Sequence, residues 1–344
     1  MLSPCYHRLR MREPAVEINF DGQGKLFGQV VFPLEQSWQG RPTLNLPVCV
    51  MSNGDGPTVA LLAGNHGDEY EGPLVLGRLI RELDRSALQG RLIILPTVNL
   101  PAVLAHTRES PLDGKNLNRI WPGDVNGTPT ERIVAWLDQE IFTRSQVVMD
   151  LHTGGFALEL IPMSMCHYTD DRVRRAEIRA AQAAFNAPLS VELSLDPGRP
   201  TASGRAHERN LLVVGSESGG GGVVTPRSVA DCYYGVRNVL AHLGVLPVAM
   251  ASGRRRQHTR YTRKWGHEAE MRCDGPGVFV PFCKLWDKVE EGQPAGQLVR
   301  PDEPNATPRT LAFPASGLVA ARRATSGVTS DDVLYWIVHD VQED

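Results

Sequence analysis

The sequence predicts an α/β fold, in which a sheet is covered by helices on both faces, followed by a smaller C-terminal all-β domain. Between residues 58 and about 246, short apolar runs alternate with amphipathic segments. This alternation is typical of strands buried between two layers of helices. After Pro247 the pattern changes to short Val, Leu and Ile runs separated by Gly and Pro turns, which favours strands alone.

The composition is that of an ordinary globular protein. The chain has 344 residues, 42% hydrophobic and 22% charged, with a net charge of −3, and is long enough for one large domain or two. The near-neutral charge argues against nucleic-acid or membrane partners, and no apolar run approaches the roughly 18 residues of a membrane span. Six scattered cysteines without a C-x-x-C pair favour reduced thiols in a cytoplasmic protein. The sequence does not determine the oligomeric state, and a homo-oligomer remains open.

The same patterns divide the chain into four segments. Residues 1–15 are basic and lack the apolar core of a secretory signal, so we expect a disordered leader, with Met11 as an alternative start. Residues 16–250 form the expected main domain, and residues 270–344 the β domain. Residues 251–269, dense in Arg and Lys, are expected to be a solvated linker.

The main domain is predicted element by element from its apolar spacing. Residues 16–50 indicate short strands and turns. The predicted strands are 58–63, 91–95, 146–151 and 211–215, and the predicted helices are 71–85, 129–142, 170–186 and 226–243. In such sheets, ligands bind at the carboxyl ends of strands.

The first candidate site is the stretch G-N-H-G-D-E-Y-E-G at residues 64–72, directly after the predicted strand 58–63. Asp68 is placed to cap the following helix, with Glu71 as its capping-box partner. Capping does not account for His66 and Glu69. Their His-x-x-Glu spacing at a strand end directs an imidazole and a carboxylate at one point, as two zinc ligands would be.

The end of the strand 146–151 supplies a third candidate ligand. His152 lies in D-L-H-T-G-G, in the same strand-end position as His66. Alone it is better explained as a buried core histidine. Together, His66, Glu69 and His152 predict a two-histidine, one-carboxylate centre with an open position, the pattern of a catalytic zinc, with one Zn²⁺ per chain. Asp150 is expected to contact one of these ligands without binding the metal itself, or to be structural.

Two further loops are predicted at the same edge of the sheet. Residues 107–123 form a long polar loop that carries Arg108 and Arg119; these are surface charges, or a carboxylate fork and an oxyanion donor if they lie in a pocket. The other loop, at 216–222, is S-E-S-G-G-G-G, which is either flexible or a close approach of backbone to a ligand. Glu217, at the end of a strand, is a candidate general base.

Taken in order, G-N-H-G-D-E-Y-E-G, N-L-N-R, D-L-H-T-G-G and the Glu before the glycines resemble the succinylglutamate desuccinylase/aspartoacylase family. The longer forms S-P-L-D-G-K-N-L-N-R-I-W-P-G and E-S-G-G-G-G are most similar to the branch that contains N-α-acetyl-L-2,4-diaminobutyrate deacetylase. The resemblance implies a zinc-carboxypeptidase-like mixed sheet with a barrel-sandwich-like C-terminal domain. It also implies zinc-dependent hydrolysis of the amide bond of a small N-acyl amino acid, with an acetyl group favoured.

The resemblance also implies a role for each matching residue. His66, Glu69 and His152 correspond to the zinc ligands, and Glu217 corresponds to the general base and acid. Arg108 corresponds to the arginine that polarises the scissile carbonyl. Asn118 and Arg119 correspond to the pair that holds the substrate carboxylate.

Three other interpretations remain open. The same residues would serve a metallocarboxypeptidase acting on short peptides, or a non-catalytic relative that binds a small molecule. Residues 288–299 and 313–319 also resemble the two halves of a biotinyl/lipoyl-type carrier domain. The tip between these halves, residues 300–309, has no lysine to modify, which argues against carrier chemistry.

Overall fold

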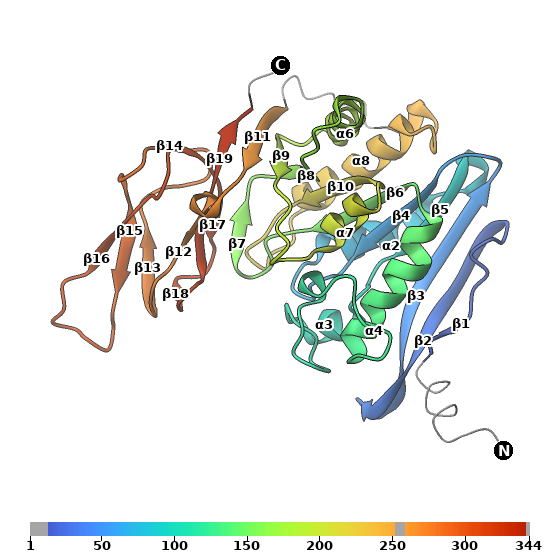
Figure 1. The fold of residues 1–344 in the computed structure, drawn as a ribbon, viewed down its shortest axis with the longest axis horizontal. Helices are drawn as coiled ribbons and strands as arrows, with labels where there is room; N and C mark the ends of the chain where they lie inside the picture. Colours follow the sequence, from blue (N-terminus) through green and yellow to red (C-terminus); the bar gives the residue numbers. More distant parts are fainter. Residues whose placement is uncertain (1–12, 252–258, 342–344) are drawn as a thin grey trace.

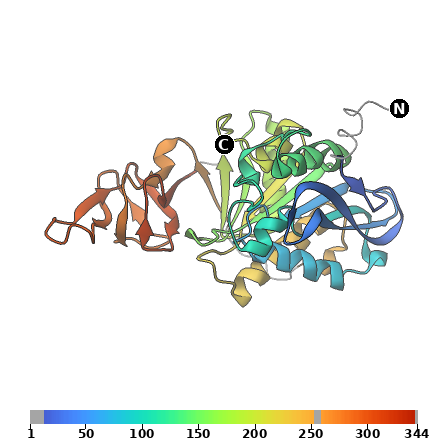
Figure 2. The ribbon, with the colours of Figure 1, turned by 90° about the horizontal axis from the view of Figure 1, so that it is seen from below.

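The computed structural model describes residues 13–251 and 259–341, which form an α/β body with a group of strands projecting from one side (Figures 1 and 2). The expected leader lies outside the described residues up to residue 12. Its last residue, Ala15, already belongs to strand β1, which pairs with β2. No helix in the described ranges is long and apolar enough to cross a membrane.

The strands, in chain order, are β1 (Ala15–Val16), β2 (Gly24–Trp38), β3 (Arg41–Asn53), β4 (Thr58–Ala63), β5 (Gly90–Leu95), β6 (Val147–His152), β7 (Leu158–Leu160), β8 (Met163–His167), β9 (Leu189–Leu193), β10 (Leu212–Glu217), β11 (Arg260–Lys264), β12 (Glu270–Arg272), β13 (Gly277–Pro281), β14 (Lys288–Val289), β15 (Pro294–Val299), β16 (Arg309–Ala312), β17 (Gly317–Arg323), β18 (Gly327–Val328) and β19 (Val333–Asp340). The α-helices are α2 (Glu71–Glu82), α3 (Leu100–Ala105), α4 (Pro129–Trp136), α5 (Phe142–Arg144), α6 (Arg172–Phe185), α7 (Ala202–Glu208) and α8 (Pro226–His242). The short helices are η1 (Arg85–Ala87), η2 (Leu117–Arg119), η3 (Leu137–Ile141), η4 (Val248–Met250) and η5 (His267–Ala269).

The large sheet is mixed and has helices on both faces, as the sequence predicts. Its order is β1-β2-β3-β5-β4-β6-β10-β8-β9-β11-β19-β17-β14, with β4 parallel to β5 and β6, and β6 parallel to β10. Side chains of β4 alternate between two cores: Leu61 packs in the core that holds α2, α6 and α8, and Leu62 in the core that holds α4, α5 and α7. A strand with apolar side chains on both faces must be covered on both.

Two predicted helices are altered toward their C-terminal ends. The helix predicted for 71–85 ends at Glu82, and the one predicted for 129–142 is interrupted by the π-helical η3. The predicted cap at Asp68 is wrong: Tyr70 is the N-cap residue of α2 and makes no side-chain cap. The Oδ2 atom of Asp68 instead accepts a hydrogen bond from the backbone N–H of Phe156, at 2.9 Å.

Part of the expected linker is a strand. Residues 252–258 lie outside the described residues, but Arg260–Lys264 form β11, parallel to β9 and antiparallel to β19. Thr262 is fully buried, and the charged neighbours are paired: Arg263 with Glu192 at 3.7 Å, and Lys264 with Glu270 at 2.6 Å. The strands and carboxylates that pair with β11 are not apparent from the local sequence. The run of charges alone therefore predicts a linker, whereas the structure has a strand.

The C-terminal strands surround a core of their own. A four-stranded sheet, β16-β15-β13-β18, packs with β12, β14, β17 and β19 around Phe279, Phe313 and Tyr335. Figure 2 shows these strands beside the α/β body. Because β11 and β7 pair with β19 and β17, the two parts share one continuous sheet.

Candidate metal centre

The three predicted ligands come together at one edge of the sheet. His66 follows β4, Glu69 immediately precedes α2, and His152 is the last residue of β6. Because β4 and β6 are neighbouring parallel strands, with Ala63 opposite Leu151, their carboxyl ends deliver both histidines to the same place. All three side chains are buried, and their candidate ligand atoms lie within 4.8 Å of one another.

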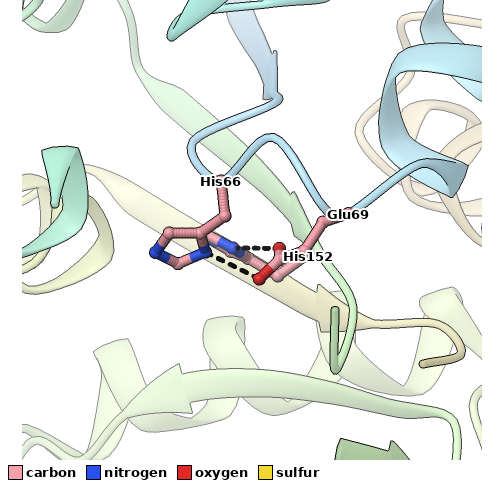
Figure 3. A group of neighbouring side chains, drawn as sticks. All are labelled: His66, Glu69 and His152. Atoms are coloured by element: carbon pink, nitrogen blue, oxygen red, sulfur yellow. Dashed lines mark hydrogen bonds and ion pairs between the residues drawn. The ribbon is translucent and has the colours of Figure 1, made fainter. Parts of the chain in front are cut away.

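The Glu69 carboxylate lies beside the two imidazoles and turns one oxygen toward the same nitrogen of each (Figure 3). Its Oε1 is 2.6 Å from Nδ1 of His66, and its Oε2 is 2.8 Å from Nδ1 of His152. Burial alone would raise the pKa of Glu69, but the two histidines outweigh burial and hold it well below its usual range. The centre therefore presents an ionised carboxylate between two imidazole Nδ1 atoms.

The other nitrogen of each ring faces an oxygen. His152 Nε2 lies 2.9 Å from Oδ2 of Asp150, and His66 Nε2 lies 3.1 Å from Oδ1 of Asn116. Metal-bound histidines commonly donate their second N–H to such an oxygen, which fixes the ring and the tautomer. This contact matches the supporting role predicted for Asp150.

The charges around His152 indicate whether a metal cation would fit beside its ring. Both ring nitrogens face carboxylates, but a neutral imidazole has only one N–H to donate. Burial would lower the pKa of His152, yet the charges of Asp150 and Glu69 outweigh it and raise the pKa well above the usual value. The site thus favours a positive charge at Nδ1, and a nitrogen, oxygen and nitrogen donor set is suited to zinc.

Glu217 and Arg108 lie beside this cluster. Glu217 ends β10 and is paired in register with His152 on β6, and its buried Oε2 has no hydrogen-bond partner among the described residues. Burial, followed by the charge of Glu69, raises the pKa of Glu217 well above its usual value. Arg108 Nη1 is 3.3 Å from Oε1 of Glu69. The structure therefore brings a carboxyl group and a guanidinium to the candidate centre.

Asn118 and Arg119 lie in η2, at the other side of the centre. Asn118 Oδ1 accepts a hydrogen bond from the backbone N–H of Ala202 at 2.7 Å, and its amide nitrogen lies 3.4 Å from Nε2 of His152. Arg119 donates from Nη1 to the backbone oxygen of Asn118 at 2.6 Å and forms no ion pair within the described part of the chain. Burial, with help from Arg199, lowers the pKa of Arg119 to about 10.

All seven predicted residues line one cavity of about 1300 Å³. The cavity extends past the candidate centre to the C-terminal strands, where Lys264, Glu270, Arg272 and Trp336 contribute to its wall. Both parts of the molecule therefore enclose the space in which a ligand would bind.

Four polar residues around the centre have contacts that sequence patterns do not reveal. Asn65 donates to Oδ1 of Asp150 at 2.6 Å, and Asn116 contacts His66. Asp68 binds the backbone of Phe156 in a distant loop, and Glu71 binds Ser228 in the first turn of α8; neither caps α2. Only their position in the sequence could have indicated these two asparagines, because Asn65 and Asn116 lie within the quoted motifs.

Fold and site together define an α/β protein with a candidate His–Glu–His metal centre at the carboxyl edge of its sheet. Residues 55–243 match the family described as the succinylglutamate desuccinylase/aspartoacylase catalytic domain. The chain is 32% identical over 328 residues to the N-alpha-acetyl-L-2,4-diaminobutyric acid deacetylase of Halomonas elongata, covering 94% of each chain. This chain belongs to the succinylglutamate desuccinylase/aspartoacylase family.

Solved structures agree with this assignment. A succinylglutamate desuccinylase/aspartoacylase from Rhodobacter sphaeroides superimposes with a TM-score of 0.88 at 32% identity, covering 96% of this chain and 99% of that one. The product-bound ectoine utilization protein EutE (DoeB) from Ruegeria pomeroyi gives a TM-score of 0.87 at 31% identity, covering 95% and 99%. The similarity thus extends through the C-terminal strands.

Proposed function

We propose that this protein is a zinc-dependent deacylase that hydrolyses the amide bond of a small N-acyl amino acid. The observation that carries the proposal is Glu217, whose buried, unpartnered oxygen lies beside a His–Glu–His cluster in the same cavity. The Halomonas relative, named as a deacetylase of an N-acetyl amino acid, supports the class of reaction.

The chemistry is divided between a metal and the side chains around it. Zinc held by His66, Glu69 and His152, one per chain, would polarise a carbonyl and lower the pKa of water. Glu217 takes a proton from the attacking water and returns it to the leaving amine, a task suited to a carboxyl group with a raised pKa. Arg108 donates hydrogen bonds to the oxyanion, where one such donor is worth roughly 3–4 kcal/mol of barrier.

The substrate is held by its α-carboxylate. Arg119 is half-buried, lines the cavity and forms no ion pair within the described ranges, so its guanidinium can bind a carboxylate through two parallel hydrogen bonds. The amide nitrogen of Asn118 lies beside it. The named relative makes acetyl the first acyl group to test, and diaminobutyrate the first amine.

We further propose that residues 270–344 form a barrel-sandwich-like domain that narrows the entrance to the site, while residues 16–250 form the catalytic domain. The separate core around Tyr335 supports this division, as do Glu270 and Trp336 in the cavity wall. A narrowed entrance favours small N-acyl amino acids over peptides.

The test is amine release by the zinc-loaded protein. Nα-acetyl-diaminobutyrate, N-acetylaspartate, N-succinylglutamate and short peptides should be compared at equal concentration, for the wild type and for Glu217→Gln. We expect hydrolysis of the acyl amino acids, and a loss of roughly 10²–10⁴-fold in Glu217→Gln with zinc retained. Preferred cleavage of peptides would favour a carboxypeptidase, and binding without turnover a non-catalytic relative.

A further inference from the structure

Two acidic side chains flank the candidate ligand Glu69 without serving as ligands. Asp68 and Glu71 are 5% and 2% exposed. Asp68 accepts a hydrogen bond from the backbone of the loop after His152, at Phe156. Glu71 reaches in another direction, where its Oε1 accepts a hydrogen bond from the hydroxyl of Ser228 at 2.8 Å. A buried carboxylate is costly unless such contacts hold it.

Glu71 lies against the turn that follows Glu217. Gly219 has φ +129°, and a Cβ built there would lie 2.6 Å from Oε1 of Glu71 and 3.2 Å from Cβ of Ser228. The carboxylate therefore occupies the space that a side chain at position 219 would take. Ser228 itself belongs to the capping box of α8, where its hydroxyl accepts from the backbone N–H of Thr225 at 3.0 Å.

The same turn fixes Glu217 relative to the ligand strand. The N–H of Ser218 donates to the backbone oxygen of His152 at 3.0 Å, and the N–H of Gly154 donates to the oxygen of Gly219 at 3.1 Å. A shift of this turn would therefore move Glu217 with respect to His152. Glu71 Oε1 lies next to this turn, at 2.6 Å from the position that a Cβ of residue 219 would take.

We propose that Glu71 is a positioning residue, which holds the turn of residues 217–219 against the first turn of α8 so that Glu217 keeps its place in the cavity. The proposal rests on the proposed role of Glu217. Glu71 touches neither substrate nor metal in this arrangement. Its effect on turnover passes through Glu217, which distinguishes it from a residue that only stabilises the fold.

The first experiment compares Glu71→Ala, Glu71→Gln and a matched control, Glu82→Ala, in the zinc-loaded protein. Glu82 is the last residue of the same helix and is 48% exposed. We expect Glu71→Ala to lower kcat by about tenfold or more, since small misplacements of a reacting group are this costly. KM and zinc content should stay near those of the wild type. Glu71→Gln, which keeps an oxygen for Ser228, should recover most of kcat, and Glu82→Ala should not lower it.

The second experiment tests whether the effect passes through Glu217. In the Glu217→Gln background, adding Glu71→Ala should change the residual rate by less than about twofold, because two residues that act as a unit are not additive. Ser228→Ala, which removes the other partner, takes the place of Glu71→Ala if that variant does not fold.

Three results would overturn the proposal: a normal kcat in Glu71→Ala, loss of zinc in that variant, or a full additional loss in the Glu217→Gln background. A near wild-type kcat in Glu217→Gln alone would instead overturn the proposed role of Glu217. An impaired Glu217→Gln with additive effects would overturn only the positioning role of Glu71. The two failures are therefore distinguishable.

Discussion

Replacing Asp150 by Asn changes one buried atom behind the candidate metal centre. Asp150 is 1% exposed, with Oδ2 at 2.9 Å from Nε2 of His152 and Oδ1 at 2.6 Å from the amide nitrogen of Asn65. Both neighbours donate when His152 presents its Nδ1 to a metal. In Asp150→Asn, either orientation of the new amide therefore turns an NH₂ group toward a donor, and one hydrogen bond is lost.

The expected cost follows from that lost hydrogen bond. Leaving a buried donor unpaired costs about 1–3 kcal/mol. A supporting contact behind a metal-bound histidine is typically worth about 10–100-fold in metal affinity, which is about 1.4–2.7 kcal/mol. The two estimates agree, so we expect the zinc Kd of Asp150→Asn to rise by about 10–100-fold.

The assay is a competition titration of zinc against a chromophoric chelator. The control is the swapped pair, Asn65→Asp together with Asp150→Asn. In this pair the new amide at position 150 donates to the new carboxylate at position 65 and turns its oxygen to His152. We expect the swapped pair to bind zinc more tightly than Asp150→Asn alone. A wild-type Kd in Asp150→Asn, or no recovery in the swapped pair, would refute the hydrogen-bond reasoning.

Three further outcomes are expected. His152→Ala should lose zinc and turnover together, and full zinc occupancy measured in this variant would reject His152 as a ligand. Arg119→Lys keeps the charge but loses the planar fork, so KM for the acyl amino acid should rise more than kcat falls; equal cleavage of the α-amide of the same substrate would show that the carboxylate is not bound. Burial would raise the pKa of Glu270, but Lys264 and then Arg199 lower it from 4.5 to about 2. Its charge therefore stabilises the folded state above pH 4.5, and this contribution is lost as pH falls toward 2. Urea unfolding should show Glu270→Gln less stable than the wild type by about 3 kcal/mol at pH 7, with the difference narrowing in acid, and a constant difference would contradict this.

The central strands could be predicted because their apolar runs are continuous. The predicted strand 58–63 matches β4 at both ends, and 91–95 differs from β5 by one residue. The strands β8 and β9 were not predicted, since buried polar side chains interrupt them. Ser164 and Ser190 face each other at 3.3 Å, and Glu192 pairs with Arg179 at 3.3 Å. Such strands become favourable only once their partners are in place.

The candidate ligands could be predicted for a different reason. His66, Glu69 and His152 lie within a few residues of strand ends, and parallel pairing of β4 with β6 brings those ends together whatever else the chain does. The contacts of Asp68 and Glu71 could not be predicted in this way. Their partners are 88 and 157 residues away along the chain, Phe156 in a loop and Ser228 in the first turn of α8, and the positions of both depend on the complete sheet.

The stretch G-N-H-G-D-E-Y-E-G combines these two kinds of residue in one short connection. The backbone at Gly67 approaches the start of the 100–107 segment so closely that a Cβ there would lie 1.8 Å from the oxygen of Ala102. The N–H of Gly67 also donates to the backbone oxygen of Thr107 at 2.8 Å, and the neighbouring His66 and Glu69 line the cavity. Their neighbours Asp68 and Glu71 then face the loops that follow His152 and Glu217. The connection therefore has two tasks. Glu69 faces the candidate metal centre, while Asp68 and Glu71 on either side of it contact the segments that complete the cavity.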